Sequence, residues 1–517
     1  MSSMIDLHKP TGKPLALLNP LVLLTAFTAG FSPQACNDFF LTLARTLFAY
    51  VVWRRHRQET FEQLEDALHS LLNDTGLHVL TDVINRHRLQ QPHRVIIDDV
   101  PHTMVLPDSG LTIITPYGPV VTSRALYRQH GLRPAKGVVA LGLLERRLGL
   151  IGHQTSRMAR ICARFEAHNP SRLAHELMTV AGLVSPGRSA LDRFGRFVGA
   201  ALADAMPETL KTLRAEVQAP QGVALMLASL DRVSVPMHEE VAEETATKEA
   251  LARPRRRPYK RKPPSKFEIH YRMVFVACLS LYDHQGMCLG TLRYGAPADA
   301  DPSQLAQQVA SDVAWVRRSN PEAGLDVCLD GALDLWKVLL LPLEALSGPP
   351  LRKVVDWYHF WERTHPVLKL LFDEVSLNRW KKSLQKQTGR LVALERAMLD
   401  RMVELPSQAI YDEVDKYLNY LEKRKGLFEY GAQVDDERHL GSGTVEASCK
   451  LVVTMRLKRG GQRWKTDGVK AIVALSATAN SRPLPERRLP QLDRWEQVWT
   501  RFSQRFISDI QPFPVAA

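Results

Sequence analysis

Cysteine is scarce in this sequence, and no two cysteines lie close together. The chain of 517 residues has no CxxC pair, and its six cysteines are Cys36, Cys162, Cys278, Cys288, Cys328 and Cys449. Zinc ribbons and small disulfide scaffolds both need clustered cysteines, so neither class fits. We therefore expect a reducing, cytoplasmic compartment.

Long hydrophobic runs are also missing. The most apolar stretch near the start, PLALLNPLVLLTAFTAGF, is interrupted by Asn19 and Pro20, and residues 1–13 lack the cationic head of a signal peptide. Because a membrane helix needs about 20 consecutive apolar residues, the sequence predicts no membrane span.

The chain has fewer acidic than basic residues. The chain holds 68 Lys and Arg against 55 Asp and Glu, which gives a formal net charge of +13. This excess favours a phosphate-rich partner, through long-range attraction and the release of counterions. A basic protein without such a partner would have the same composition, so the charge alone does not decide.

What is present is a succession of helical and strand-rich regions, separated by changes in hydrophobic periodicity and by Gly and Pro. In chain order we predict an N-terminal helical region (1–92), a small β module (93–150), a helical region (151–220), an α/β core in two parts (221–364 and 438–485) with a mobile charged insertion (238–266) and a helical insertion (365–437), and a C-terminal tail (486–517).

Two helices joined by a short turn are predicted within residues 151–220. Ser185 is a good N-cap and Pro186 suits a first helical position, so the second helix would start there and display Arg188, Arg193 and Arg196. The pair is either a helix-turn-helix that reads DNA or an ordinary helical hairpin with solvated arginines.

Five strand-like segments define the core. Three of them, VALMLASLDRVSVPM, FEIHYRMVFVACLSLYD and MCLGTLRYG, follow one another, and LDVCLDG and KVVDWYH then alternate with helical stretches. This order is typical of a mixed sheet flanked by helices, so the predicted fold class is α/β. The insertion at 238–266 runs from acidic to basic and proline-rich, a composition that cannot bury a core; its basic half either grips DNA phosphates or is a solvated linker.

Three acids stand out by their context. Asp231 lies in an apolar strand, Asp330 ends another and is followed by glycine, and Glu446 falls in the first turns of a helix that starts at GSG. A buried carboxylate is costly unless it is paired or binds a cation. Each acid alone could cap a strand or pair with a neighbouring base. Together they suit two Mg²⁺ or Mn²⁺ ions, which take oxygen ligands and support in-line displacement at a phosphodiester.

Several motifs resemble those of the DDE transposases of bacterial insertion sequences, most closely the ISKra-type members. The similarity lies in LDRVSVPM, LRYG, LDGALDLWKV, VVDWYH and GSGTVEASCKLVVTMRLKRGGQRW, within about residues 150–480. It implies an RNase H-like catalytic domain in which Asp231, Asp330 and Glu446 bind two metal ions, with a helical insertion before the glutamate. It also implies a bacterial, nucleoid-associated protein.

The motif around Asp356 is similar to the D-x-x-H signature of related transposases. Asp356 and His359 are therefore accessory candidates, and Asp356 is the second choice for the second metal ligand; alternatively both side chains only satisfy local hydrogen bonds. Two features depart from the family pattern. Arg232 follows the first acid where glycine is usual, and YRQHGLRP lacks the cysteine pair that holds zinc in many relatives.

Basic residues follow Glu446 closely. On a helix that starts near Gly443, the acid would face the metals while a run of cations continues towards the DNA backbone: Lys450, Arg456, Lys458, Arg459, Arg463 and Lys465. These could instead form a solvated helix face.

The sequence thus predicts a transposase that cleaves and joins DNA, acting on the element's ends and on target DNA as a homo-oligomer. The alternatives are a DNA-binding protein without catalysis, either a domesticated transposase or a regulator, and a structure-selective nuclease on the same fold.

Overall fold

The structure is a computed structural model. It describes residues 60–131, 140–240, 267–297, 300–387, 389–405, 407–428, 430, 441–487 and 489–512, with a few positions between 36 and 48. Most of the predicted insertion at 238–266, and the helices predicted before residue 60, lie outside the described residues. The chain divides into two compact units: residues 1–159, 177–186 and 503–517 form the first, and residues 160–176 and 187–502 form the second.

The first unit combines one long helix with a five-stranded antiparallel sheet. Helix α3 (Phe61–Leu89) starts at a capping box, in which Thr60 and Gln63 exchange hydrogen bonds between side chain and backbone. The sheet has the order β11-β1-β2-β3-β4. Its strands are β1 (Arg94–Ile97), β2 (Val100–Thr115), β3 (Gly118–Gln129), β4 (Leu141–Gly142) and β11 (Ile510–Pro512), and α4 (Leu143–Leu148) follows β4. Short antiparallel strands were predicted at this place, and β1 to β3 occupy it.

The segment predicted as a C-terminal tail (486–517) contains a helix and a strand. Helix α19 (Arg494–Gln504) buries Trp495, Val498, Trp499 and Phe502, which recur at the spacing of one helix face. Strand β11 then pairs with β1. Residues 494–504 and 510–512 are therefore part of the fold.

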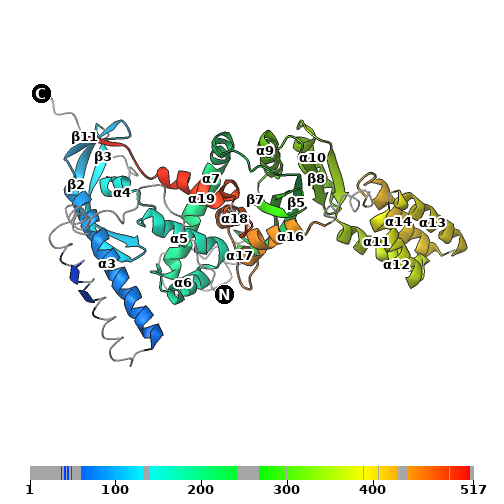
Figure 1. The fold of residues 1–517 in the computed structure, drawn as a ribbon, viewed down its shortest axis with the longest axis horizontal. Coiled ribbons are helices and arrows are strands. Elements are labelled where there is room, and N and C mark those ends of the chain that lie inside the picture. Colours follow the sequence, from blue (N-terminus) through cyan, green and yellow to red (C-terminus); the bar gives the residue numbers. More distant parts are fainter. Residues whose placement is uncertain are drawn as a thin grey trace, which may run out of the picture. The chain divides into compact units, whose positions relative to one another are not determined.

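The second unit is built on a six-stranded mixed sheet with the order β10-β7-β6-β5-β8-β9 (Figure 1). Its strands are β5 (Leu225–Glu240), β6 (Phe267–Tyr282), β7 (Cys288–Ala296), β8 (Gly324–Leu329), β9 (Leu351–Val355) and β10 (Arg482–Pro483). Strands β5, β6 and β7 are antiparallel, whereas β8 and β9 run parallel to β5. Three strands in series followed by alternating helix and strand were predicted, and the α/β class is confirmed.

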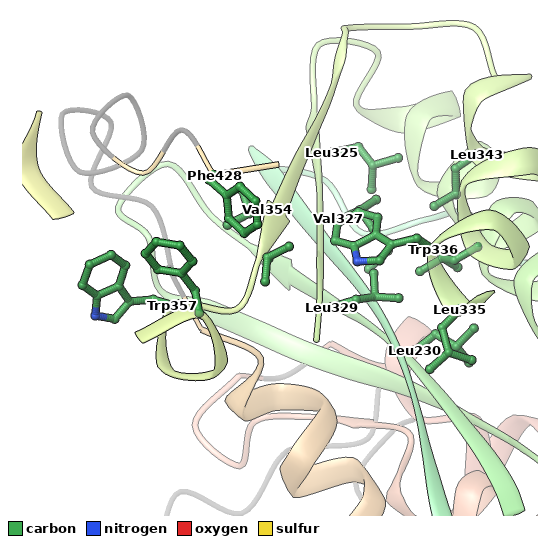
Figure 2. Packing of buried hydrophobic residues seen from close by; sticks show 14 of the residues in the cluster. Leu230, Leu325, Val327, Leu329, Leu335, Trp336, Leu343, Val354, Trp357 and Phe428 are labelled. Atoms are coloured by element: carbon green, nitrogen blue, oxygen red, sulfur yellow. The ribbon is translucent and has the colours of Figure 1, made fainter. Parts of the chain in front are cut away.

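Helices cover the sheet because its strands are apolar on both faces. Helices α9 (Ser303–Ser319) and α10 (Leu333–Glu344) pack against one face. Figure 2 shows Leu335, Trp336 and Leu343 of α10 beside the leucines and valine of β8. The other face of β5 and β6 is covered by α16 (Gly443–Cys449), the π-helical turn η2 (Lys450–Thr454), α17 (Met455–Leu457) and α18 (Thr466–Asn480).

The region predicted as helical at 151–220 contains α5 (Ser156–His168), α6 (Ser171–Val180) and α7 (Arg188–Glu216). Helix α7 begins at N-cap Gly187 rather than at Ser185. It is 29 residues long and packs along α18, where a Cβ on Gly199 would lie 2.3 Å from the backbone oxygen of Ala471. One face of α7 is therefore part of the core of the second unit.

The helical insertion starts earlier than predicted. Helix α11 (Trp357–Leu371) begins directly after β9, inside the range predicted for the core, and α12 (Glu374–Lys386), α13 (Arg390–Glu404) and α14 (Gln408–Glu422) follow. These helices pack on one another through Phe360, Leu368, Leu394 and Val414. Among the described residues, no helix is long and apolar enough to cross a membrane.

Candidate metal centre

Three acids lie on or directly after three neighbouring parallel strands. Asp231 is within β5, Asp330 directly follows β8, and Asp356 directly follows β9. The last pairs before these acids are Ala228 with Val327 between β5 and β8, and Leu329 with Val355 between β8 and β9. The charges of Asp330 and His359 both act on Asp231, and His359 contacts Asp356, so the three acids lie in one neighbourhood of the sheet.

Asp231 faces α16. On β5 it shares a face with Val235 and Met237, which pack against α16 and α18. The Cys449 thiol of α16 donates a hydrogen bond to Asp231 Oδ2 at 3.5 Å. Burial raises the pKa of Asp231, and the charge of Asp330 adds to this increase. Cys449 was not singled out in the sequence, where nothing but its position three residues after Glu446 points to it.

Asp330 lies in the turn between β8 and α10. Its Oδ1 accepts a hydrogen bond from Ala332 N at 2.9 Å. The following residue, Gly331, is held by the helical insertion, because Arg424 Nε donates to its carbonyl oxygen at 2.8 Å. A Cβ on Gly331 would lie 3.0 Å from the Tyr420 hydroxyl and 3.2 Å from Arg424 Nε, so glycine allows these two side chains to approach closely. The insertion thereby fixes the turn that carries Asp330.

Asp356 is fully buried and makes three hydrogen bonds. It is the N-cap of α11, and its Oδ1 accepts from His359 N at 2.9 Å and lies 3.0 Å from His359 Nδ1. Its other oxygen accepts from Ser442 N at the start of α16. Burial opposes ionisation, but the hydrogen bonds from Ser442 and His359 outweigh it and lower the pKa of Asp356. Asp356 therefore remains charged inside the protein.

Glu446 completes the cluster from α16. It is exposed, and Ser442 Oγ donates a hydrogen bond to its Oε1 at 3.2 Å. Ligand atoms of Asp356, His359 and Glu446 all lie within 4.8 Å of one another, and among the described residues this is the only such group of three. Asp231, Asp330 and Glu446 do not form a group this close, so the structure places Asp356 and His359 nearer to Glu446 than the sequence suggested.

The donor set fits a divalent cation. Mg²⁺ and Mn²⁺ accept carboxylate oxygens, and opposite ligands on an ion with bonds of about 2.1 Å lie about 4.2 Å apart. The ligand atoms of Asp356, His359 and Glu446, all within 4.8 Å of one another, lie close to this spacing. In the tautomer with the proton on Nδ1, His359 donates to Asp356 and its Nε2 lone pair is available to bind a metal ion.

Arg232 does not disturb this face. It is next to Asp231 on β5 and therefore points to the opposite side of the sheet, where its guanidinium forms an ion pair with Asp334 of α10 at 2.8 Å. The departure from glycine at this position adds no positive charge beside the acids.

The basic residues after Glu446 divide into two groups. Lys450, Lys458, Arg459, Arg463 and Lys465 are exposed, which agrees both with contact to DNA and with a solvated face. Arg456 differs from that prediction. It is 2% exposed and pairs with the buried Glu166 at 3.4 Å, because η2 and α17 turn this side chain towards α5. Its role is to balance a buried acid, and it is removed from the candidate DNA contacts.

The arginines of α7 lie on the solvent side of that helix. Arg188, Arg193 and Arg196 are exposed, although Arg196 forms an ion pair with Asp192 at 3.1 Å. The guanidinium of Arg196 also lies 5.9 Å from the ring of Trp464, which sits between Arg463 and Lys465. Of the cations of α7, Arg196 therefore lies beside the basic segment that follows Glu446.

Neither a scan against protein-family models nor a search of the curated proteins finds a match for this chain.

Proposed function

We propose that the protein is a DDE-type transposase that cleaves and joins DNA at a divalent-metal centre on an RNase H-like core. The observation that carries this proposal is the placement of Asp231, Asp330 and Asp356 on or directly after adjacent parallel strands, with Asp356 beside Glu446. Acidic side chains that gather in one neighbourhood repel one another, and bound cations relieve that repulsion. The strand order of the sheet supports the RNase H-like assignment.

Each side chain has a role in this scheme. Asp231 and Asp330 would hold one side of the metal centre, and Glu446 and Asp356 the other, with His359 oriented by Asp356. Bound Mg²⁺ or Mn²⁺ would activate a water molecule or a 3′-hydroxyl and stabilise the leaving oxygen. Ser442 positions both Asp356 and Glu446, through its backbone N–H and its hydroxyl respectively.

The exposed cations of α7 and of the segment after Glu446 would position the DNA. Phosphate contacts from Arg188, Arg193, Arg463 and Lys465 set the register of the backbone without reading its sequence. A homo-oligomer on DNA is expected, since two ends of the element must be brought together before joining.

The test is a cleavage and joining assay on DNA that carries the ends flanking the gene. We expect cleavage with Mg²⁺, none with chelator, and loss of cleavage with retained binding in Asp231→Ala, Asp330→Ala and Glu446→Ala. Full activity in all three variants would refute the proposal. Binding without cleavage by the native protein would favour the non-catalytic alternative, and cleavage without joining would favour a structure-selective nuclease.

A further inference from the structure

The helical insertion carries a groove lined by cations. It lies at the junction of α12 and α13, has a volume of about 510 Å³, and is lined by Arg379, Lys382, Lys386 and Arg390 around Trp380. No acid occurs between Glu374 and Glu395, whereas five Lys and Arg do. The groove is therefore lined by basic residues and formed mostly by a segment that contains no acid.

The cations of this groove lack acidic partners. Among the residues that the structure describes, no carboxylate forms an ion pair with Arg379, Lys382 or Lys386; Arg379 only lowers the pKa of Asp373 from a distance, after the hydrogen bonds from Ser376. Arg390 is held by Ser383 Oγ at 2.6 Å and stacks over Trp380 at 5.4 Å, both neutral partners.

The spacing of these cations lowers the stability of α12 as an isolated helix. Arg379 and Lys382 are three residues apart and Lys382 and Lys386 four, so like charges face each other on one side of α12. Helix α14 of the same insertion and the turn after it show the usual alternative, because Lys416 and Lys425 each pair with a glutamate three residues earlier. A polyanionic ligand would neutralise this row of cations.

We propose that this groove binds the phosphate backbone of DNA, as a second contact surface apart from the metal centre. Residues 379–386 span about 10 Å along the helix axis, which covers about three phosphates of one strand. The groove is tied to the centre through α11, which starts at Asp356 and packs against α12. DNA held in this groove would be fixed relative to the acids. The inference concerns binding and does not need catalysis.

The experiment is a DNA-binding titration across salt concentrations. The groove variant carries Arg379→Gln, Lys382→Gln and Lys386→Gln, and the matched control carries Lys416→Gln on α14 with Lys423→Gln and Lys425→Gln in the turn that follows it. The probe is duplex DNA with the ends that flank the gene. Loss of three phosphate contacts lowers the slope of log affinity against log salt by about 2.7. Between about 50 and 200 mM salt, wild-type affinity then falls about 40-fold more than that of the groove variant, and the control behaves as wild type.

Three results would overturn the inference. They are an unchanged slope in the groove variant, an equal change in the control, or a change seen with RNA and not with DNA. Failure of the native protein to bind DNA would refute the proposed function as well, whereas binding with an unchanged slope refutes the groove alone. Lys382→Arg with Lys386→Arg keeps the charge and should retain the wild-type slope, which separates loss of charge from damage to the helix.

Discussion

Asp356 should contribute more to stability than an ordinary helix cap, because it joins two helices. Asp356 caps α11 and also accepts from Ser442 N at the start of α16, whereas Asp373 caps α12 from an exposed position and accepts from Ser376, a residue of the same helix. Removing a cap costs about 1 kcal/mol, and leaving a buried N–H unsatisfied costs about 1–3 kcal/mol more. Asp356→Ala should thus lower the free energy of unfolding by about 2–4 kcal/mol and Asp373→Ala by about 1 kcal/mol.

Urea denaturation of both variants, in chelator and in Mn²⁺, measures this difference. If Asp356 is also a metal ligand, Mn²⁺ at about one hundred times its dissociation constant should stabilise the wild type and Asp373→Ala by about 2.7 kcal/mol, and Asp356→Ala by much less. Equal losses for the two variants in chelator would refute the assigned link between α11 and α16. Equal stabilisation of both by Mn²⁺ would remove Asp356 from the metal centre.

Three further predictions concern residues outside the cluster. Arg232→Gln should lower the free energy of unfolding, measured by urea denaturation, by up to about 1 kcal/mol, because its ion pair with Asp334 is exposed. The Mn²⁺ affinity of this variant, measured by calorimetry, should be unchanged. Gly199→Ala should lower the free energy of unfolding by about 1–3 kcal/mol, because its Cβ would meet the α18 backbone. Gly460→Ala, whose Cβ would have no atom within 4 Å, should lower it by less than about 0.5 kcal/mol. Equal melting temperatures for the two variants would contradict the close packing. Burial raises the pKa of Glu166 from 4.5 to about 7, so its contribution to stability is complete below pH 4.5 and is lost as the pH rises through 7. Between pH 4.5 and 7, the free energy of unfolding should fall by on the order of 3 kcal/mol less in Glu166→Gln than in the wild type. An equal fall in both proteins would contradict this.

The sequence predicted the core well because strand signals are strong where both faces of a sheet are apolar. Leu230, Leu325 and Val327 lie in such runs, and the order of strands and helices follows from them. Asp231 and Asp330 stood out against these runs, and Asp356 through the resemblance of its motif to a D-x-x-H signature, so all three could be found without a structure. The closeness of Asp356 and His359 to Glu446 could not, because it depends on contacts between distant segments.

The rest of the site depends on contacts that sequence does not encode locally. Ser442 matters because its N–H meets Asp356, and Arg456 is buried because η2 turns it towards Glu166. A π-helical turn shifts the faces of a helix, so the regular period used for the cations after Glu446 did not apply. Trp495 of α19 was missed because its apolar stripe is short and follows a proline-rich stretch.

The most direct test of the metal centre is to change the scissile phosphate itself. DNA ends with sulfur in place of a non-bridging oxygen at the cleaved phosphate should be cut poorly with Mg²⁺, which prefers oxygen, and better with the softer Mn²⁺. The proposed centre, built from Asp231, Asp330, Asp356 and Glu446, predicts loss of cleavage in Mg²⁺ and its recovery in Mn²⁺ for one of the two sulfur stereoisomers. Equal cleavage of the sulfur and oxygen substrates in Mg²⁺, for both stereoisomers, would contradict it.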